Sequence, residues 1–105
     1  MEALIELDSS MSEMEVAEIV SLIGANHLYG INNRDLSTLS VDLNNTPKMM
    51  GYLPDAAVKM SLSGVQQAKD VLFLYASGAH AILVGSYLMQ SDNPTKEVRM
   101  LVEAV

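Results

Sequence analysis

The sequence of 105 residues contains no cysteine and no tryptophan, and only 5% of its residues are aromatic. Without cysteine the chain forms neither disulfides nor thiolate metal sites, which is typical of proteins in a reducing compartment. Because aromatic side chains are so few, the core has to be aliphatic, with the eight methionines as adaptable filler. We expect no bound metal and no cofactor.

Basic residues are also scarce. Six Lys and Arg stand against 13 Asp and Glu, which gives a formal net charge of -7. Nucleic acid binding depends on Lys and Arg that neutralise phosphates, so we expect no nucleic acid partner. A small phosphorylated ligand is still compatible with this charge, because helix N-termini and glycine-rich turns bind phosphate through backbone N–H groups.

Long apolar runs are missing as well. No stretch approaches the length that spans a bilayer, and no basic leader precedes an apolar segment. We therefore expect a soluble protein without a membrane span, located in the cytoplasm or in an organelle stroma or matrix.

The length suits one small domain, residues 1–105, with a single core. Short aliphatic runs alternate with segments of helical periodicity, and strands that alternate with helices pair in parallel. The expected fold is α/β, with four parallel βα units and helices on one side of the sheet. The predicted strands are Ala3–Leu7, His27–Ile31, Ala57–Met60 and Ala81–Val84.

Capping residues mark the expected helix ends. A glutamate follows both Ser10 and Ser12 at the spacing of a capping box. Thr46 with Pro47 predicts the start of a brief helix that continues through 48–53. The other predicted caps are Gly24, Gly78 and Asn93.

A polar cluster, residues 32–35, follows the second predicted strand directly. Side chains just past the carboxyl ends of parallel strands converge on the ligand face of such folds, which favours a binding role. The alternative is an ordinary polar loop in which Arg34 pairs with Asp35. His27 and His80 begin their strands, at the opposite end, and we interpret both as structural.

Several motifs occur together and in order along the chain. They are Met1–Glu6, Gly30–Leu36, Val41–Leu43, Ser61–Val65 and Ala81–Met89. With these motifs the chain resembles indole-3-glycerol phosphate synthase, a TIM barrel enzyme of tryptophan biosynthesis. The resemblance implies half of a (βα)8 barrel, namely its strands five to eight, as a single (βα)4 domain.

The same resemblance implies roles for particular residues. Glu6 and Asn32 match catalytic positions, and Arg34 matches a substrate-binding position. The matches to phosphate-binding positions are Ser63, Gly64, Gly85 and Ser86. A Gly-Ser turn after a strand also suits an anion on physical grounds, although Gly85-Ser86 has the alternative of a plain strand-ending turn.

Two departures from the family pattern leave the activity open. Leu62 stands where the family has an active-site glutamate, and the family's catalytic lysines lie on strands that this chain does not contain. Its own lysines, Lys48, Lys59, Lys69 and Lys96, match none of those positions. The chain is then either half of a split synthase, inactive alone, or a non-catalytic descendant that serves as a structural or interaction subunit.

Four parallel strands alone leave two unpaired edges and half of a barrel interior exposed. We therefore expect a protein partner. It would be a second copy in a two-fold assembly, a complementary half from another chain, or a larger complex.

Overall fold

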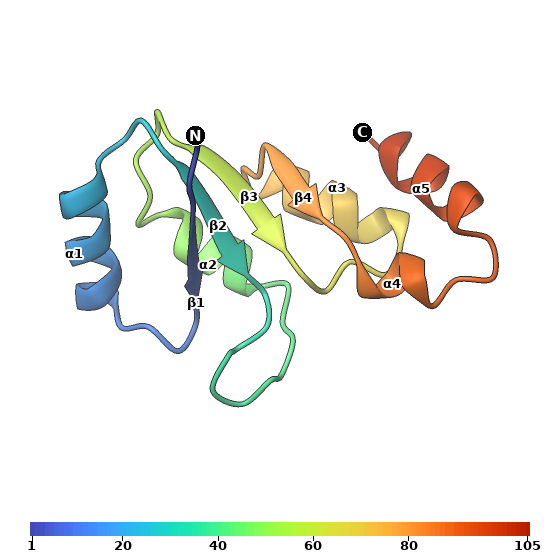
Figure 1. The fold of residues 1–105 in the computed structure, drawn as a ribbon, viewed down its shortest axis with the longest axis horizontal. Helices are drawn as coiled ribbons and strands as arrows, with labels where there is room; N and C mark the ends of the chain where they lie inside the picture. The colour runs from blue at the N-terminus through green and yellow to red at the C-terminus, as the bar shows by residue number, and fades with distance from the viewer.

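The computed structural model describes all of residues 1–105 and shows a single sheet with helices along it (Figure 1). The four strands pair in the order β1-β2-β3-β4, and every pair is parallel. The elements are β1 (Leu4–Asp8), α1 (Glu13–Ile23), β2 (Leu28–Asn32), α2 (Asn45–Met50), β3 (Val58–Leu62), α3 (Ala68–Ala76), β4 (Ala81–Leu83), α4 (Ser86–Met89) and α5 (Pro94–Val102). The predicted parallel α/β architecture is confirmed, and the strand ends lie within two residues of the predicted ones.

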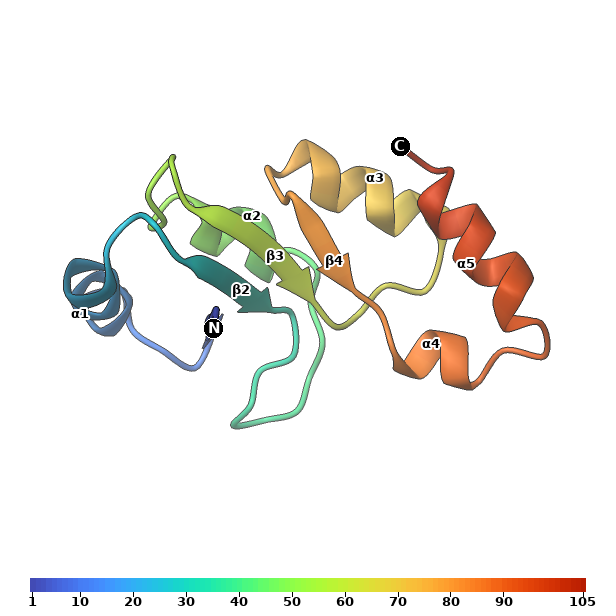
Figure 2. The same ribbon diagram turned by 45° about the horizontal axis from the view of Figure 1, so that its top comes forward.

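The register assigns alternate residues to the two faces of the sheet. Glu6, Gly30 and Met60 lie opposite one another across β1, β2 and β3, so they share one face. Leu7 and Ile31 are opposite each other on the other face and are fully buried. In Figures 1 and 2, α2 and α3 lie along that second side of the sheet.

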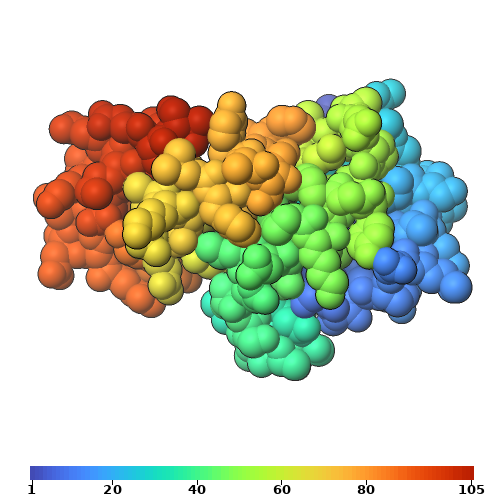
Figure 3. All heavy atoms as spheres, turned by 180° about the vertical axis from the view of Figure 1, so that it is seen from behind, coloured from blue at the N-terminus to red at the C-terminus, as the bar shows by residue number.

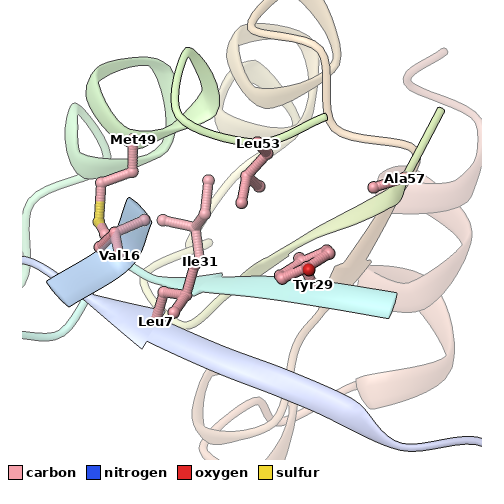
Figure 4. Close-up of a cluster of buried hydrophobic side chains, with 7 residues drawn as sticks. All are labelled: Leu7, Val16, Tyr29, Ile31, Met49, Leu53 and Ala57. Atoms are coloured by element: carbon pink, nitrogen blue, oxygen red, sulfur yellow. The ribbon is translucent and has the colours of Figure 1, made fainter. Parts of the chain in front are cut away.

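The core on the helical face has two parts. The larger cluster brings Val16 of α1 and Met49 of α2 onto Leu7 and Ile31, and Figure 4 shows these side chains pointing toward one another. The smaller cluster joins α3 and α5 and contains Val71, Leu74 and Leu101, and Ile82 of β4 packs against it. Burying each large aliphatic side chain contributes about 1.5–3 kcal/mol, so this face holds the helices to the sheet.

Seen from behind, the colours run across the molecule in chain order, from α1 at one end to α5 at the other (Figure 3). Successive βα units are therefore neighbours in space, as in a barrel that has been opened. The molecule is elongated, with extents of 43 × 29 × 27 Å.

The other face of the sheet is open. Leu4, Val58 and Leu83 lie on it and are 39%, 45% and 57% exposed. In Figure 1 the strands stand in front of α2 and α3, and no helix crosses them on the near side. None of the helices has both the length and the apolar character needed to span a membrane.

Capping explains both ends of α1 and the start of α5. Ser12 begins α1 with the predicted capping box: its Oγ accepts from the Glu15 N–H at 3.1 Å, and its own N–H donates to the Glu15 carboxylate at 3.2 Å. Gly24 ends α1 in the left-handed region with φ 86°. Asn93 caps α5 as predicted, accepting from the Lys96 N–H at 3.1 Å.

Two predicted helix starts differ in the structure. Of the two capping-box candidates, Ser10 does not begin α1, because the helix starts after Ser12. Thr46 is not an N-cap, because α2 begins at Asn45 and ends at Met50, earlier than predicted. The Thr46 hydroxyl is bonded to buried side chains instead of the helix backbone. The predicted glycine cap of α3 is confirmed: Gly78 follows Ser77 with a positive φ of 102°, and the Gly78 and Ala79 N–H groups donate to the Tyr75 and Leu74 carbonyls at 3.0 and 3.1 Å.

Candidate functional site

The turns after β3 and β4 line one cleft at the carboxyl edge of the sheet. The cleft has a volume of about 540 Å³. Its lining includes Ser63, Gly64, Gly85 and Ser86, the four residues predicted to hold phosphate, together with Arg34 from the loop after β2. Gln66, Tyr87 and Gln90 also line it and were not predicted: Gln66 and Gln90 lie just past the motifs, and Tyr87 lies in a motif but was given no role.

Ser63 and Gly64 both adopt left-handed backbone conformations, with φ 69° and 90°. A Cβ on Gly64 would lie 2.9 Å from both Leu43 Cδ2 and Val41 Cγ1, so glycine is required there for space as well as for φ. Ser63 has no such freedom, and a non-glycine residue in this region carries strain. The Ser63-Gly64 turn therefore has a left-handed backbone that is unfavourable for Ser63 and needs support from its surroundings.

Gly85 differs from Gly64. Its φ of -131° suits any residue, and a Cβ built on it meets no atom within 4 Å. Neither the backbone φ nor the packing therefore requires glycine at position 85. The effect of glycine here is to leave open space beside the cleft.

Glu6, Asn32 and Arg34 are linked in a chain of hydrogen bonds. Asn32 Nδ2 donates to Glu6 Oε1 at 2.7 Å, and Asn32 Oδ1 accepts from the Arg34 N–H at 2.9 Å. The two contacts fix the orientation of the amide, because its nitrogen must face the carboxylate. Glu6 and Asn32 lie on the open face of the sheet and are not among the residues that line the cleft.

The alternative pairing of Arg34 with Asp35 is not formed. Arg34 Nη1 donates to the Leu39 carbonyl at 2.9 Å. The Asp35 carboxylate accepts from Ser37 Oγ at 2.6 Å, from the Ser37 and Thr38 N–H groups, and from Ser9 Oγ. These bonds, led by the one from the Ser37 hydroxyl, lower the pKa of Asp35 from 3.8 to about 2. Arg34 therefore lines the cleft without pairing with Asp35, and the loop holds both its guanidinium and the Asp35 carboxylate.

A buried polar network lies behind the cleft and was not foreseen. Asn33, Thr46 and Ser61 are at most 1% exposed, and their side chains bond to one another at 2.7–2.9 Å. The signal was present in the sequence as polar residues within or beside apolar segments. Their convergence could not be read from spacing, because they come from three different parts of the chain.

Leu62, which the resemblance matches to a glutamate of the family, is buried on the open face of the sheet. It is 3% exposed, and its Cδ1 lies 2.8 Å from where a Cβ on Gly30 would be. The side chain therefore lies over Gly30 and fills the space that the missing Cβ leaves. No carboxylate is supplied at this point of the site.

None of the lysines lines the cleft. Lys59 is opposite Tyr29 in the register and is 9% exposed, so it belongs to the helical face. His80 Nδ1 accepts from the Lys59 N–H at 3.1 Å, at the end of the sheet away from the cleft, while His27 is exposed. No group of three His, Asp or Glu side chains converges where a metal ion could be held.

Comparison with known proteins gives one consistent family. The family model for indole-3-glycerol phosphate synthase matches residues 1–101. A protein of that name from Methanopyrus kandleri is 42% identical over 106 residues, which cover 99% of this chain and 39% of the relative. Its counterpart from Carboxydothermus hydrogenoformans is 37% identical over 97% of this chain and 37% of the relative.

A longer relative shows the same similarity. The multifunctional tryptophan biosynthesis protein of Schizosaccharomyces pombe is 35% identical over 97% of this chain, which covers 13% of that protein. The chain thus spans less than half the length of each of these relatives.

Proposed function

Because the chain belongs to the indole-3-glycerol phosphate synthase family, we propose that it is the carboxyl-terminal, phosphate-binding half of such a barrel. In this proposal it has no synthase activity alone and is completed by another chain. The observation that carries the proposal is the convergence of Ser63, Gly64, Gly85 and Ser86 with Arg34 on one cleft.

The chemistry of the cleft suits a phosphate monoester. The hydroxyls of Ser63 and Ser86 can donate to phosphate oxygens, and Gly64 and Gly85 allow the ligand to approach the backbone. Arg34 supplies a permanent positive charge in the same cleft. Glu6 and Asn32, joined at 2.7 Å on the adjoining open face, would then contact the reacting end of the substrate.

The expected inactivity of the isolated chain follows from the residues that the site does not supply. Closing an indole ring with loss of carbon dioxide and water needs a proton donor aimed at the leaving oxygen. No lysine lines the cleft, and Leu62, which the resemblance matches to a glutamate, supplies no carboxylate. General acid catalysis typically contributes about 10²–10⁴-fold, so a site without its acid is strongly impaired.

The open face and edges support a partner chain. β1 and β4 each have one unpaired edge, and Leu4, Val58 and Leu83 are partly exposed between them. Parallel strands added at both edges would close a barrel of about eight strands, whose interior side chains can fill. The occupant we favour is a chain that carries the remaining four βα units, since the longer relatives contain the additional length.

Co-expression tests the proposal. The chain is produced with a segment carrying strands one to four of a longer relative, and the purified complex is assayed for conversion of the anilino precursor to indole-3-glycerol phosphate. We expect co-purification in a one-to-one complex by native mass spectrometry, and activity in the complex only. Activity of the isolated chain that scales with its concentration would contradict the proposal, as would failure of the two chains to associate.

A second function has one observation in its favour. The burial of Leu62 over Gly30 favours a non-catalytic descendant that serves as a structural subunit. Synthase activity of the Leu62→Glu variant in the co-expressed complex distinguishes the split synthase from the structural subunit. A split synthase should gain activity from the restored carboxylate, whereas a structural subunit should stay inactive while losing stability at a buried position.

A further inference from the structure

We infer that Asn33 is the positioning residue of the cleft: from behind, its side-chain amide holds the Ser63 carbonyl and so keeps the Ser63-Gly64 turn in its left-handed conformation. This inference rests on the proposed anion site. Asn33 is fully buried and does not line the cleft, so it acts through the turn and does not touch the ligand.

The side-chain amide of Asn33 belongs to a closed ring of hydrogen bonds. Nδ2 donates to Ser61 Oγ at 2.9 Å, and Oδ1 accepts from Thr46 Oγ1 at 2.8 Å. Thr46 donates its only hydroxyl proton to Asn33. In the 2.7 Å contact between the Thr46 and Ser61 hydroxyls, Ser61 must therefore be the donor. Each hydroxyl then donates once and accepts once. Because hydroxyls rotate, the ring could also run in reverse around a flipped amide, so the orientation is decided by the Ser63 carbonyl, which can only accept and therefore faces Nδ2.

The second proton of the amide points to the turn. Asn33 Nδ2 also donates to the Ser63 carbonyl at 3.0 Å. Within the turn, Ser63 carries a positive φ without being glycine, so its conformation needs support from outside the turn. The ring holds the amide in place, and the amide in turn restrains the carbonyl of Ser63.

The backbone of Asn33 ties the same residue to two further segments. Its N–H donates to the Leu62 carbonyl at 2.8 Å, and its carbonyl accepts from the Asp42 N–H at 2.8 Å and from Asn45 Nδ2 at 3.3 Å. Asn33 therefore connects the end of β3, the loop before α2 and the turn at the cleft. No buried polar side-chain atom in the structure lacks a partner, so the network is fully satisfied and rigid.

Two substitutions separate positioning from general stability. Asn33→Asp keeps the shape of the side chain and can still accept in the ring, but it cannot donate to the Ser63 carbonyl. Thr46→Val is the matched control, because it removes a buried hydroxyl from the ring at nearly unchanged volume and leaves the contact with Ser63. Asn33→Ala also removes the hydrogen bond to the Ser63 carbonyl, but it does not introduce the negative charge that Asn33→Asp brings.

The first measurement is the amide ¹H–¹⁵N signals of Ser63 and Gly64 in the ligand-free protein, within the assembly in which it is purified. The second is calorimetric affinity for inorganic phosphate, and the third is unfolding in urea. We expect both Asn33 variants to shift the two amide signals, and Asn33→Ala to weaken phosphate binding by about ten-fold, the scale of strain at such a residue. Thr46→Val should lose stability yet keep phosphate affinity within about two-fold.

Each result decides the question. Equal loss of affinity in Thr46→Val and Asn33→Ala, or unmoved signals in both Asn33 variants, overturns the positioning role. If the parent binds no phosphate, the proposed function loses its anion site, but the ligand-free signals still test Asn33. If Asn33→Ala does not fold, Asn33→Asp and Thr46→Val carry the comparison of the signals by themselves.

Discussion

Asn32 Nδ2 donates to Glu6 Oε1 at 2.7 Å, which joins the middle of β1 to the end of β2 on the open face of the sheet. Asn32 is buried and Glu6 is exposed, so the carboxylate is held in place while it still reaches solvent. A carboxylate held in this way is available to a substrate only if the open face of the sheet is part of the site.

The first prediction concerns the charge of Glu6. In the completed barrel, Glu6→Gln should lower kcat by about 10² or more, because it removes a charged group while its amide oxygen still accepts from Asn32. The free energy of unfolding should change by less than about 0.5 kcal/mol, as is usual for an exposed position. Glu2→Gln makes the same charge change at another exposed residue and should leave kcat unchanged. An unaltered kcat in Glu6→Gln would remove Glu6 from the catalytic machinery.

The strands and most caps could be predicted because their signals are local. Aliphatic runs bounded by polar residues define a strand, and Ser12 and Asn93 lie next to the backbone groups that they cap. The cleft could be anticipated for a different reason: parallel strands in sequence order place their turns side by side at one edge. Those parts of the fold follow from pattern and topology alone.

The parts that could not be predicted depend on contacts between distant segments. Thr46 has the sequence context of an N-cap, but its hydroxyl is bonded to Asn33 and Ser61, 13 and 15 residues away. Arg34 and Asp35 are adjacent, which favoured a pair, yet four better-placed donors surround the carboxylate. In both cases a tertiary contact outweighed a local preference.

The second prediction concerns Asp35 and pH. Its bonds stabilise the charged form, so the pKa lies near 2 in the folded chain, below its ordinary value of 3.8. The stability that these bonds add is present above pH 3.8 and is lost as the pH falls toward 2. The carboxyl ¹³C signal of Asp35 should titrate near pH 2, and Ser37→Ala should move the midpoint upward because it removes the strongest donor. Ser40→Ala, in the same loop, is the control. A parent midpoint near 3.8 would mean that the loop is open in solution.

The third prediction concerns the open face. Leu83 is 57% exposed on it, and a partner that completes the barrel would bury this side chain. Leu83→Glu should therefore weaken association by about ten-fold or more, since it places a charge in an apolar contact. Leu22→Glu is the matched control, because Leu22 is 87% exposed on α1, on the helical side. Sedimentation of the two variants over a concentration series makes the comparison. Equal association of the two would show that the open face is not the interface.

The last prediction concerns the anion itself. Gly85 has an ordinary φ and open space around a built Cβ, so a side chain can be added there without disturbing the fold. Substitutions at Gly85 can therefore distinguish the effect of an added charge from the effect of an added side chain. Gly85→Asp and Gly85→Asn add side chains of nearly the same size, but only the aspartate repels a phosphate that lies in the cleft between this turn and the Ser63-Gly64 turn. We expect Gly85→Asp to abolish binding of inorganic phosphate or a sugar phosphate by calorimetry.

Gly85→Asn should retain part of that affinity, because its amide can donate to phosphate oxygens. The difference between the two variants should shrink at high salt, where screening weakens the repulsion of an exposed charge. Affinity of Gly85→Asp equal to that of the parent would place any bound anion away from this turn. Since the turn after β4 would then only end a strand, that result would favour the structural subunit over the split synthase.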